Sequence, residues 1–366
     1  MHGIESGLKL LKNAPCVEDF SDLPETLTVD DDKNNLKKAI RMISYSDDEL
    51  MKKPVIVVGS GRSGMNFLGD AIAQHPRLAV AHEPRLIWKS GNDRISDALR
   101  PHHARPEVIA DIRSRFANVV RLAGKERYID VTPGNSVRLG FVDKVFPDCQ
   151  FVHFIRDGVD NVLSMRRFYG VVARTLRSNT PKLRDSAAAR RVKEMRLKQV
   201  PYMAMEAARH LAPHWLLPYI GPPVVGVRLP AMSAMRKEMD LLDVCFLQWR
   251  SSVEWACQFG RSLPPGRYME CRIETFCEDD VRRIYDFLGL EVTPEALEFV
   301  RKEFEPGRIG PAMQDCFPEE LERLKAMVAP TMRWIESYNP HDAASRVPTR
   351  PLVDLPASML KDEVAV

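Results

Sequence analysis

One glycine-rich stretch limits the possible folds of this 366-residue chain more than any other part of it. Residues 57–68 read VVGSGRSGMNFL and continue an apolar run that starts at residue 54. An apolar run, a glycine turn and a helical pattern predict a strand, a tight turn and a helix. Backbone N–H groups at such a turn and at the start of the helix attract an anion. The stretch therefore predicts a phosphate-binding loop, although an ordinary strand-to-helix turn also uses glycines.

The turn fits the dinucleotide fingerprint GxGxxG, which makes an NAD(P)-binding Rossmann oxidoreductase one candidate. Glu83 follows a possible strand at 78–81 and stands about 20 residues after the turn, where a ribose-binding acid is expected. Against this interpretation, Arg62 and Ser63 fill positions that usually carry small or apolar residues. It also leaves the segment 156–168 unexplained.

The turn also fits the first half of GxxxxGK[ST], the loop of nucleoside triphosphatases. Met65 stands where that loop needs its lysine, and Asn66 where it needs the hydroxyl that binds Mg²⁺. This disfavours a triphosphatase or kinase.

The rest of the chain alternates short apolar runs with segments of helical spacing, which predicts an α/β fold with a central parallel sheet flanked by helices on both faces. The expected strands are 55–58, 78–81, 128–131, 151–155 and 268–271. The expected helices are 67–74, 106–122, 137–146, 157–168, 280–288, 294–304 and 318–337.

We expect three parts along the chain. Residues 1–50 form an N-terminal extension with one helix near 36–44, and residues 51–338 form one domain. Within that domain, residues 170–262 are mostly helical with proline-rich joints. After the domain, residues 339–366 form a loosely ordered tail.

Composition narrows the functional class. The formal net charge is only +3, which does not suggest a general nucleic-acid binder. The chain has no run of about 18 apolar residues, so no membrane span is expected, and its N-terminus lacks the apolar core of a secretory signal. The 7 cysteines are scattered without a CxxC pair. We therefore expect a cytoplasmic protein without a disulfide framework or a zinc site.

A second motif follows the predicted strand 151–155. Arg156 stands at the end of this strand, and Ser164 lies eight residues on, about two helical turns down the next helix and on the same face. Both side chains can converge on one phosphate at the edge of the sheet. The alternative is an arginine capped by Asp157 and a solvated serine.

Together the two motifs resemble those of the sulfotransferases that use 3′-phosphoadenosine 5′-phosphosulfate. That family's first loop reads approximately [RK]SGTT, and its second motif reads approximately RDPxxxxxSxxRF. Three further segments resemble the family: the strand end DVTP at 130–133, the stretch YMECRIETFCEDDVRRIYDFLGL at 268–290, and the loop PGRIG at 306–310. The resemblance covers about residues 53–338 and implies the P-loop-like sulfotransferase fold with a helical acceptor-binding region.

The resemblance implies a donor site in which the first loop, Arg62, Ser63 and Gly64, holds the 5′-phosphosulfate. Here Met65 and Asn66 replace the family's two threonines; the Met65 backbone N–H and the Asn66 amide remain as donors. This departure keeps a non-catalytic nucleotide-binding protein as an alternative. Arg156, Ser164 and Arg308 match the residues that hold the rest of the nucleotide, the 3′-phosphate above all.

The implied reaction moves a sulfuryl group to a hydroxyl, or less favourably to an amine, and leaves adenosine 3′,5′-bisphosphate. Charge grows on the bridging oxygen, and Arg62 is the matching cation. Glu83 is the proposed base, with His82 as the local competitor. His153 lies between phenylalanines and is interpreted as a core residue. The sequence shows no metal-ligand constellation, so no metal is expected.

The acceptor is less defined. A small-molecule metabolite is favoured over a glycan or a protein tyrosine. The basic segment 174–198 is interpreted as a solvated helical face, with an anion-attracting mouth as the alternative. Four aromatic residues of the middle region either line the acceptor pocket or belong to the core: Trp215, Tyr219, Trp249 and Trp255.

Overall fold

The computed structural model describes residues 45–177, 195–211, 225–308, 310 and 316–338. In these ranges five strands form one parallel sheet in the order β2-β3-β1-β4-β5. The strands are β1 (Val55–Val58), β2 (Leu78–His82), β3 (Arg127–Val131), β4 (Gln150–Ile155) and β5 (Tyr268–Arg272). Each lies within one residue of the apolar run that predicted it. The α/β fold with a parallel sheet is confirmed.

The order of the strands places the functional loops together. β1 pairs with β3 on one side and with β4 on the other, and Val57 is in register with Val131 and with Val152. In a parallel sheet all strands end at the same edge, and ligands bind where neighbouring connections diverge. The loops after β1, β3 and β4 therefore meet at one edge.

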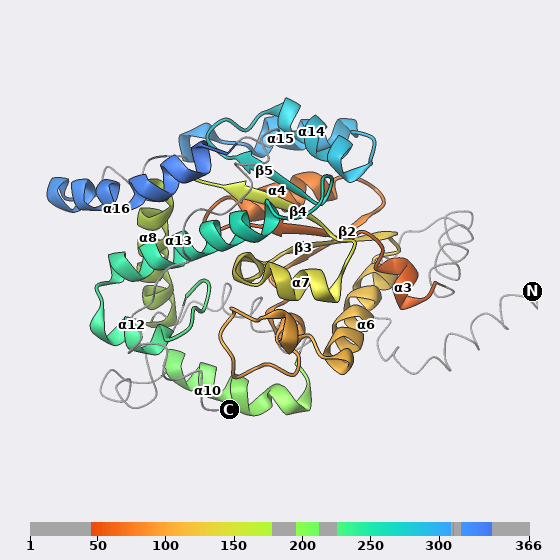
Figure 1. Cartoon of the computed structure of the whole chain (residues 1–366), viewed down its shortest axis with the longest axis horizontal. Helices are drawn as coiled ribbons and strands as arrows, with labels where there is room; N and C mark the ends of the chain where they lie inside the picture. The colour runs from red at the N-terminus through yellow and green to blue at the C-terminus, as the bar shows by residue number, and fades with distance from the viewer. Residues whose placement is uncertain (1–44, 178–194, 212–224, 309, 311–315, 339–366) are drawn as a thin grey trace, which may run out of the picture. The chain divides into compact units, whose positions relative to one another are not determined.

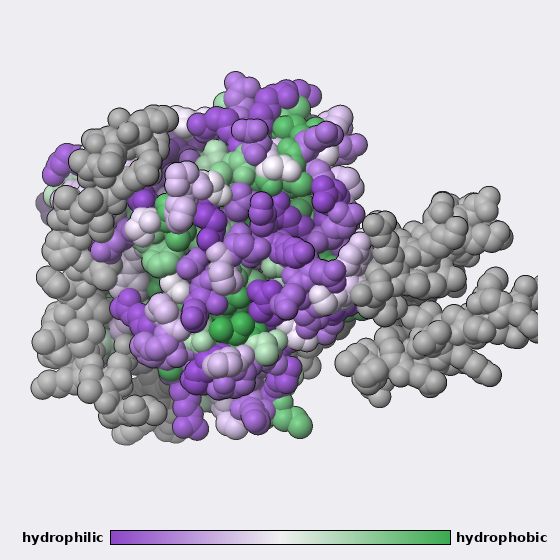
Figure 2. All heavy atoms as spheres, turned by 45° about the vertical axis from the view of Figure 1, so that its right-hand side comes forward, coloured by the Kyte–Doolittle hydropathy of each residue, from purple (hydrophilic) through white to green (hydrophobic). Residues whose placement is uncertain are grey.

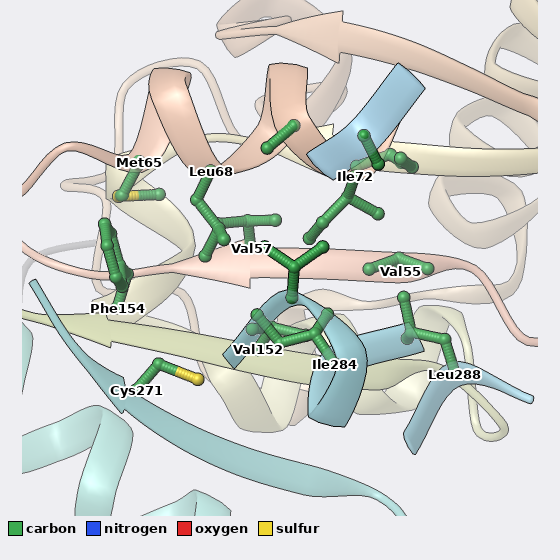
Figure 3. Packing of buried hydrophobic residues seen from close by; sticks show 14 of the residues in the cluster. Val55, Val57, Met65, Leu68, Ile72, Val152, Phe154, Cys271, Ile284 and Leu288 are labelled. Carbon is green, nitrogen blue, oxygen red and sulfur yellow. The ribbon is translucent and has the colours of Figure 1, made fainter. Parts of the chain in front are cut away.

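One face of the sheet is covered by α4 (Met65–Ala73), α14 (Glu278–Leu288) and α15 (Pro294–Glu303) (Figure 1). Alternate residues of a strand point to one face, and Val55 and Val57 of β1 point to this one. Figure 3 shows Leu68 of α4 packed over Val57. Ile284 and Leu288 of α14 belong to the same cluster, and Ile284 lies near Val152 of β4. This packing fixes the position of α4 and hence of the glycine loop that leads into it.

The other face packs against α8 (Gly158–Arg177), α13 (Leu241–Gly260) and α16 (Pro318–Glu336). Trp249 of α13 is fully buried there. Further along this face, α6 (Pro106–Leu122) supplies Phe116, which stacks on Tyr128 of β3 with ring centres 4.5 Å apart. Helices therefore lie on both faces, as predicted.

The remaining elements are short. They are α3 (Asp47–Leu50), α5 (Arg85–Trp88), α7 (Leu139–Val145), α10 (Val200–Leu211), α12 (Met232–Glu238), η1 (Pro101–His103), η2 (Pro133–Val137), η3 (Leu197–Gln199) and η4 (Pro306–Arg308). The helix expected near 36–44 and the tail 339–366 lie outside the described residues.

The described surface is largely hydrophilic in the view of Figure 2, where green hydrophobic residues form small separate groups. Among the described residues, no helix combines the length and the apolar character that a membrane crossing requires. Six of the cysteines are described as free thiols: Cys149, Cys245, Cys257, Cys271, Cys277 and Cys316. The first four are buried.

The predicted helix at 137–146 is present as α7, which begins two residues later than expected. The chain forms η2 up to Val137, leaves helical geometry at Arg138 (φ −144°, ψ 32°) and then forms α7. This break lets the Arg138 side chain turn back and donate from Nε to Asn135 Oδ1 over 2.8 Å. A local polar contact outweighs the helical pattern at this residue.

Candidate active site

The glycine loop is held at the end of β1 by the loop that follows β3. The Gly59 N–H donates to Ser136 Oγ over 2.7 Å, and the same hydroxyl donates back to Gly59 O over 2.7 Å. A Cβ atom at Gly59 would lie 2.5 Å from the Phe154 carbonyl oxygen, so β4 and the loop approach too closely for any side chain. Sequence analysis did not identify Ser136, because this contact joins residues 77 positions apart.

The turn itself uses left-handed backbone twice. Gly64 caps α4 at φ 87°, where a Cβ would meet Ile273 Cδ1 at 2.7 Å. Arg62 has φ 69°, which is unusual for a residue with a side chain and is typical of functional turns. The first N–H groups of α4, from Met65 onward, have no partner within the helix and carry its partial positive charge.

The Arg62 side chain lies beside α8, with its guanidinium carbon 5.2 Å from the centre of the Phe168 ring. Desolvation, and then the nearby Arg156 guanidinium, hold the pKa of Arg62 below its usual range. An arginine nevertheless stays charged at neutral pH. Two like charges at one loop repel each other, and a bound anion relieves that repulsion.

Ser63 and Asn66 differ in exposure. Ser63 is 1% exposed, and its buried Oγ has no hydrogen-bond partner. Its hydroxyl is therefore free to donate and to accept a hydrogen bond inside the loop. Asn66 is exposed at the first turn of α4, and Met65 packs into the core (Figure 3). The loop thus presents unused polar groups to an anion of the phosphate class.

Arg156 connects the second motif to the first. Its Nη1 donates to the Arg62 carbonyl oxygen over 2.8 Å, and its Nε donates to Asp160 Oδ2 over 2.7 Å. It is 8% exposed, and the Trp249 indole packs behind it, with Nε1 3.4 Å from Arg156 O. The strand-end arginine therefore supports the carbonyl of the strained Arg62.

Asp160 joins a third segment to this site. Its Oδ2 also accepts the Gly310 N–H over 2.9 Å, so the C-terminal loop lies beside Arg156. Sequence analysis missed Asp160, although its position four residues after Arg156 in a helix was a usable signal. Ser164 lies one further turn along α8 and is half-buried. The Arg308 side chain lies outside the described residues, and its backbone is in η4.

Glu83 stands at the same edge of the sheet, after β2. Its backbone is left-handed at φ 51°, and its N–H donates to Val131 O over 3.0 Å, which ties it to the end of β3. Its carboxylate is 41% exposed and lies 3.2 Å from Arg85 Nη2. An exposed carboxylate on a strained turn at the ligand-binding edge is compatible with a base.

His82 is the last residue of β2, and its ring binds Asp70 of α4, with Nε2 2.8 Å from Asp70 Oδ1. Both candidates therefore have a charged partner, His82 in Asp70 and Glu83 in Arg85. Glu83 is the more exposed of the two, and its choice as the base stays a prediction.

Three potential metal ligands among the described residues lie close together behind the sheet. The ligand atoms of His153, Cys257 and Glu270 lie within 4.8 Å of one another. Arg261 donates to both Glu270 oxygens over 2.7 and 2.9 Å, and His153 Nδ1 lies 2.6 Å from Tyr268 Oη. The guanidinium already supplies the positive charge that a metal would bring, so this group is interpreted as a structural network.

Of the aromatic residues expected at the acceptor pocket or in the core, Trp249 belongs to the core. Trp255 is half-buried, and its ring lies 5.2 Å from the Arg100 guanidinium carbon. Trp215 and Tyr219 lie outside the described residues, as does most of the basic segment 174–198. At the end of that segment, Arg196 forms an ion pair with Asp111.

Comparison with known families bears directly on these loops. Residues 54–216 match the family model described as "Sulfotransferase family". The match covers less than half of the chain and shows that this segment is similar to the sulfotransferase family. The matched segment includes the glycine loop, Glu83, Arg156 and Ser164, whereas β5 and the loop that contains Arg308 lie after it. No curated protein matches the chain.

Solved structures of sulfotransferases resemble the chain at low identity. The sulfotransferase domain of the Synechococcus PCC 7002 olefin synthase is 16% identical, with a TM-score of 0.41, over 77% of this chain and 96% of that one. The sulfotransferase domain from the curacin biosynthetic pathway is 13% identical, with a TM-score of 0.43, over 76% and 98%. Sulfotransferase STF9 from Mycobacterium avium is 12% identical, with a TM-score of 0.37, over 82% and 80%.

Proposed function

We propose that this protein transfers a sulfuryl group from 3′-phosphoadenosine 5′-phosphosulfate to a hydroxyl group of an acceptor. The observation that carries the proposal is the hydrogen bond from Arg156 Nη1 to the Arg62 carbonyl oxygen. It makes the two phosphate motifs parts of one site. A dinucleotide-binding protein needs the glycine turn but gives Arg156 no role, so the joined motifs favour sulfuryl transfer.

The residues present fit this donor. Arg62, the unpartnered Ser63 hydroxyl and the first N–H groups of α4 suit the phosphosulfate end. Gly64 and the backbone N–H of Met65 allow close approach, and the Asn66 amide adds a donor. Arg156, Ser164 and Arg308 are assigned to the 3′-phosphate, with Asp160 orienting Arg156.

In the reaction the acceptor oxygen bonds to sulfur as the bond from sulfur to the bridging oxygen breaks, and that electron pair leaves with adenosine 3′,5′-bisphosphate. Arg62 stabilises the charge that grows on the bridging oxygen. Glu83 accepts the acceptor proton. These roles require no metal ion. The acceptor is a soluble small molecule in the cytoplasm in our preferred version, and a glycan or a protein tyrosine in the alternative.

Ligand-induced stabilisation tests the donor site. We expect adenosine 3′,5′-bisphosphate to raise the melting temperature by roughly 4–6 °C at about 100 times its Kd, and NAD and ATP to raise it far less. Arg156→Ala and Arg156→Lys should reduce the shift. Arg301→Ala should keep it, because Arg301 is an exposed residue of α15 that pairs with Glu278 of α14.

Two outcomes would contradict the proposal. A shift of the melting temperature with NAD and none with the bisphosphate would mean that the glycine loop binds a dinucleotide. Binding of the bisphosphate without turnover of the sulfated donor, over a broad acceptor panel, would favour the non-catalytic alternative.

A further inference from the structure

A group of basic side chains includes Arg85, which contacts the candidate base Glu83. Arg85 and Lys89 belong to α5 and its C-terminal cap, Arg138 follows η2, and Arg228 precedes α12. Lys89 is 4% exposed, and the Arg138 side chain is 1% exposed. A buried cation needs an anionic or hydrogen-bonding partner, so we compare each of these cations with the groups around it.

Asp97 is the carboxylate that these cations share. It accepts the Arg228 N–H over 2.8 Å, and its Oδ1 lies 3.8 Å from Arg138 Nη1. Burial would raise the pKa of Asp97, but Lys89, Arg138 and Arg85 together hold it below its usual range. Several cations therefore act on one buried carboxylate.

Two of the positive groups, Lys89 and Arg138, lack a hydrogen-bonded carboxylate. Lys89 Nζ binds carbonyl oxygens, that of Ser96 at 2.9 Å and that of Ile95, and burial lowers its pKa to about 8. Arg138 Nη1 is buried without a hydrogen-bond partner, because 3.8 Å from Asp97 is too long for one. A buried ammonium without a carboxylate contact and an unused guanidinium donor leave unused capacity to pair with an anion.

Two more carboxylates lie nearby, and both are occupied by neutral donors. Asp93 accepts the Gln199 amide over 2.6 Å. Asp130 accepts Trp88 Nε1 and the Tyr128 hydroxyl, each over 2.8 Å, and burial raises its pKa to about 6. Neither is hydrogen-bonded to the cations in these contacts.

Arg85 is partly exposed, at 34%, and it is the member of the group that contacts the candidate base. Its Nη2 lies 3.2 Å from Glu83 Oε2, and its Nη1 donates to Gly226 O over 3.3 Å. The Arg85 N–H donates to Glu83 O over 2.7 Å, so a tight turn keeps the two residues together. While this ion pair persists, the carboxylate that must accept a proton is occupied by a guanidinium.

We propose that the acceptor is a hydroxylated acid whose anionic group binds Arg85 in place of Glu83, which frees the Glu83 carboxylate to receive the hydroxyl proton. This inference rests on the proposed sulfuryl transfer and names its substrate class. Arg85 is then a residue that determines specificity, because its partly exposed guanidinium can form a charge-assisted contact with an anion. Because Glu83 and Arg85 are adjacent, hydroxyl and acid must belong to one compact molecule or one sugar ring.

Matched acceptor pairs test the inference. We would compare 4-hydroxybenzoate, 3-hydroxybutyrate and glucuronate with their methyl esters, and measure kcat/KM for release of adenosine 3′,5′-bisphosphate. A charge-assisted contact is worth a factor of about 10 to 100, so the acids should exceed their esters by that factor. The ratio of kcat/KM for the acid to kcat/KM for its ester should fall toward one in Arg85→Gln. It should be partly restored in Arg85→Lys. Arg301→Gln should leave it unchanged.

The outcomes separate this inference from the proposed function. If the esters equal the acids, or if Arg85→Gln lowers both equally, the acid-binding role of Arg85 is wrong and sulfuryl transfer stands. If no pair reacts, calorimetry on protein saturated with adenosine 3′,5′-bisphosphate decides: acids that bind no better than their esters overturn the inference. If the bisphosphate itself does not bind, the proposed function fails, and the inference fails with it.

Discussion

At the scale of single residues, the candidate site depends on a carboxylate that we do not place in contact with substrate. Asp160 is 1% exposed and holds both the Arg156 guanidinium and the Gly310 N–H. Arg156 in turn holds the carbonyl of Arg62, which adopts left-handed backbone. A chain of contacts thus runs from α8 to the residue that would meet the leaving group.

We expect Asp160→Asn to act through this chain. Breaking a buried ion pair leaves Arg156 without its counterion and should cost about 3 kcal/mol of unfolding free energy. If Asp160 is a positioning residue, adenosine 3′,5′-bisphosphate should also bind about 10-fold or more weakly by calorimetry. Asp279→Asn, at an 88% exposed side chain, is the control. Lower stability with unchanged affinity would reduce Asp160 to a structural role.

The residues that sequence analysis missed share one property. Ser136 and Asp160 act on groups 77 and 150 positions away in the chain, namely Gly59 and Gly310. Nothing local marks Ser136 as the partner of Gly59, or Asp160 as the partner of Gly310, although the spacing of Asp160 from Arg156 was a local signal for that one contact. Arg62 and Arg156 were identifiable because their motifs are local, a strand followed at once by a turn or a helix.

At the scale of secondary-structure elements, the sequence was more informative. The α6 bounds match the predicted 106–122, because Pro106 starts the helix and its apolar spacing continues to Leu122. The strands were predictable because buried parallel strands are continuous apolar runs. Helix 137–146 was also found as α7, but its start was not predictable, since Arg138 leaves helical geometry to bind Asn135.

The close packing of α4 on the sheet can be tested by a substitution at Gly69. A Cβ there would lie 2.3 Å from Val131 Cγ2, so Gly69→Ala should push α4 away from β3. Alanine normally favours a helix by about 1 kcal/mol, but overpacking here should destabilise the protein by about 1–3 kcal/mol. Denaturant unfolding measures the change.

Two further variants make the Gly69 test specific. Gly170 of α8 would meet no atom within 4 Å, so Gly170→Ala should be neutral or stabilising. Adding Val131→Ala to Gly69→Ala should recover part of the loss, because it removes the clashing methyl groups. Equal effects of the two glycine substitutions would refute close packing of α4 on β3.

At the scale of the whole molecule, the two faces of the sheet have different tasks. The face under α4, α14 and α15 is apolar and fixes the glycine loop. The opposite face contains the polar network of His153, Glu270 and Arg261 under α13. A buried histidine in such a network makes the stability of the entire fold depend on pH.

Burial lowers the pKa of His153 from 6.5 to about 4. The unfolded chain takes up this proton near pH 6.5 and the native state only near pH 4, so the unfolded state binds more protons between these values. Its contribution to stability is therefore present above pH 6.5 and decreases as the pH falls toward 4, by about 3 kcal/mol in all.

Urea unfolding at several pH values tests this dependence. The free energy of unfolding should fall less steeply with decreasing pH in His153→Gln than in the wild type. His102→Gln, at an exposed histidine of η1, controls for the loss of one imidazole. Identical slopes for the wild type and His153→Gln would mean that His153 is protonated in the native state, and that the network carries a second positive charge beside Arg261.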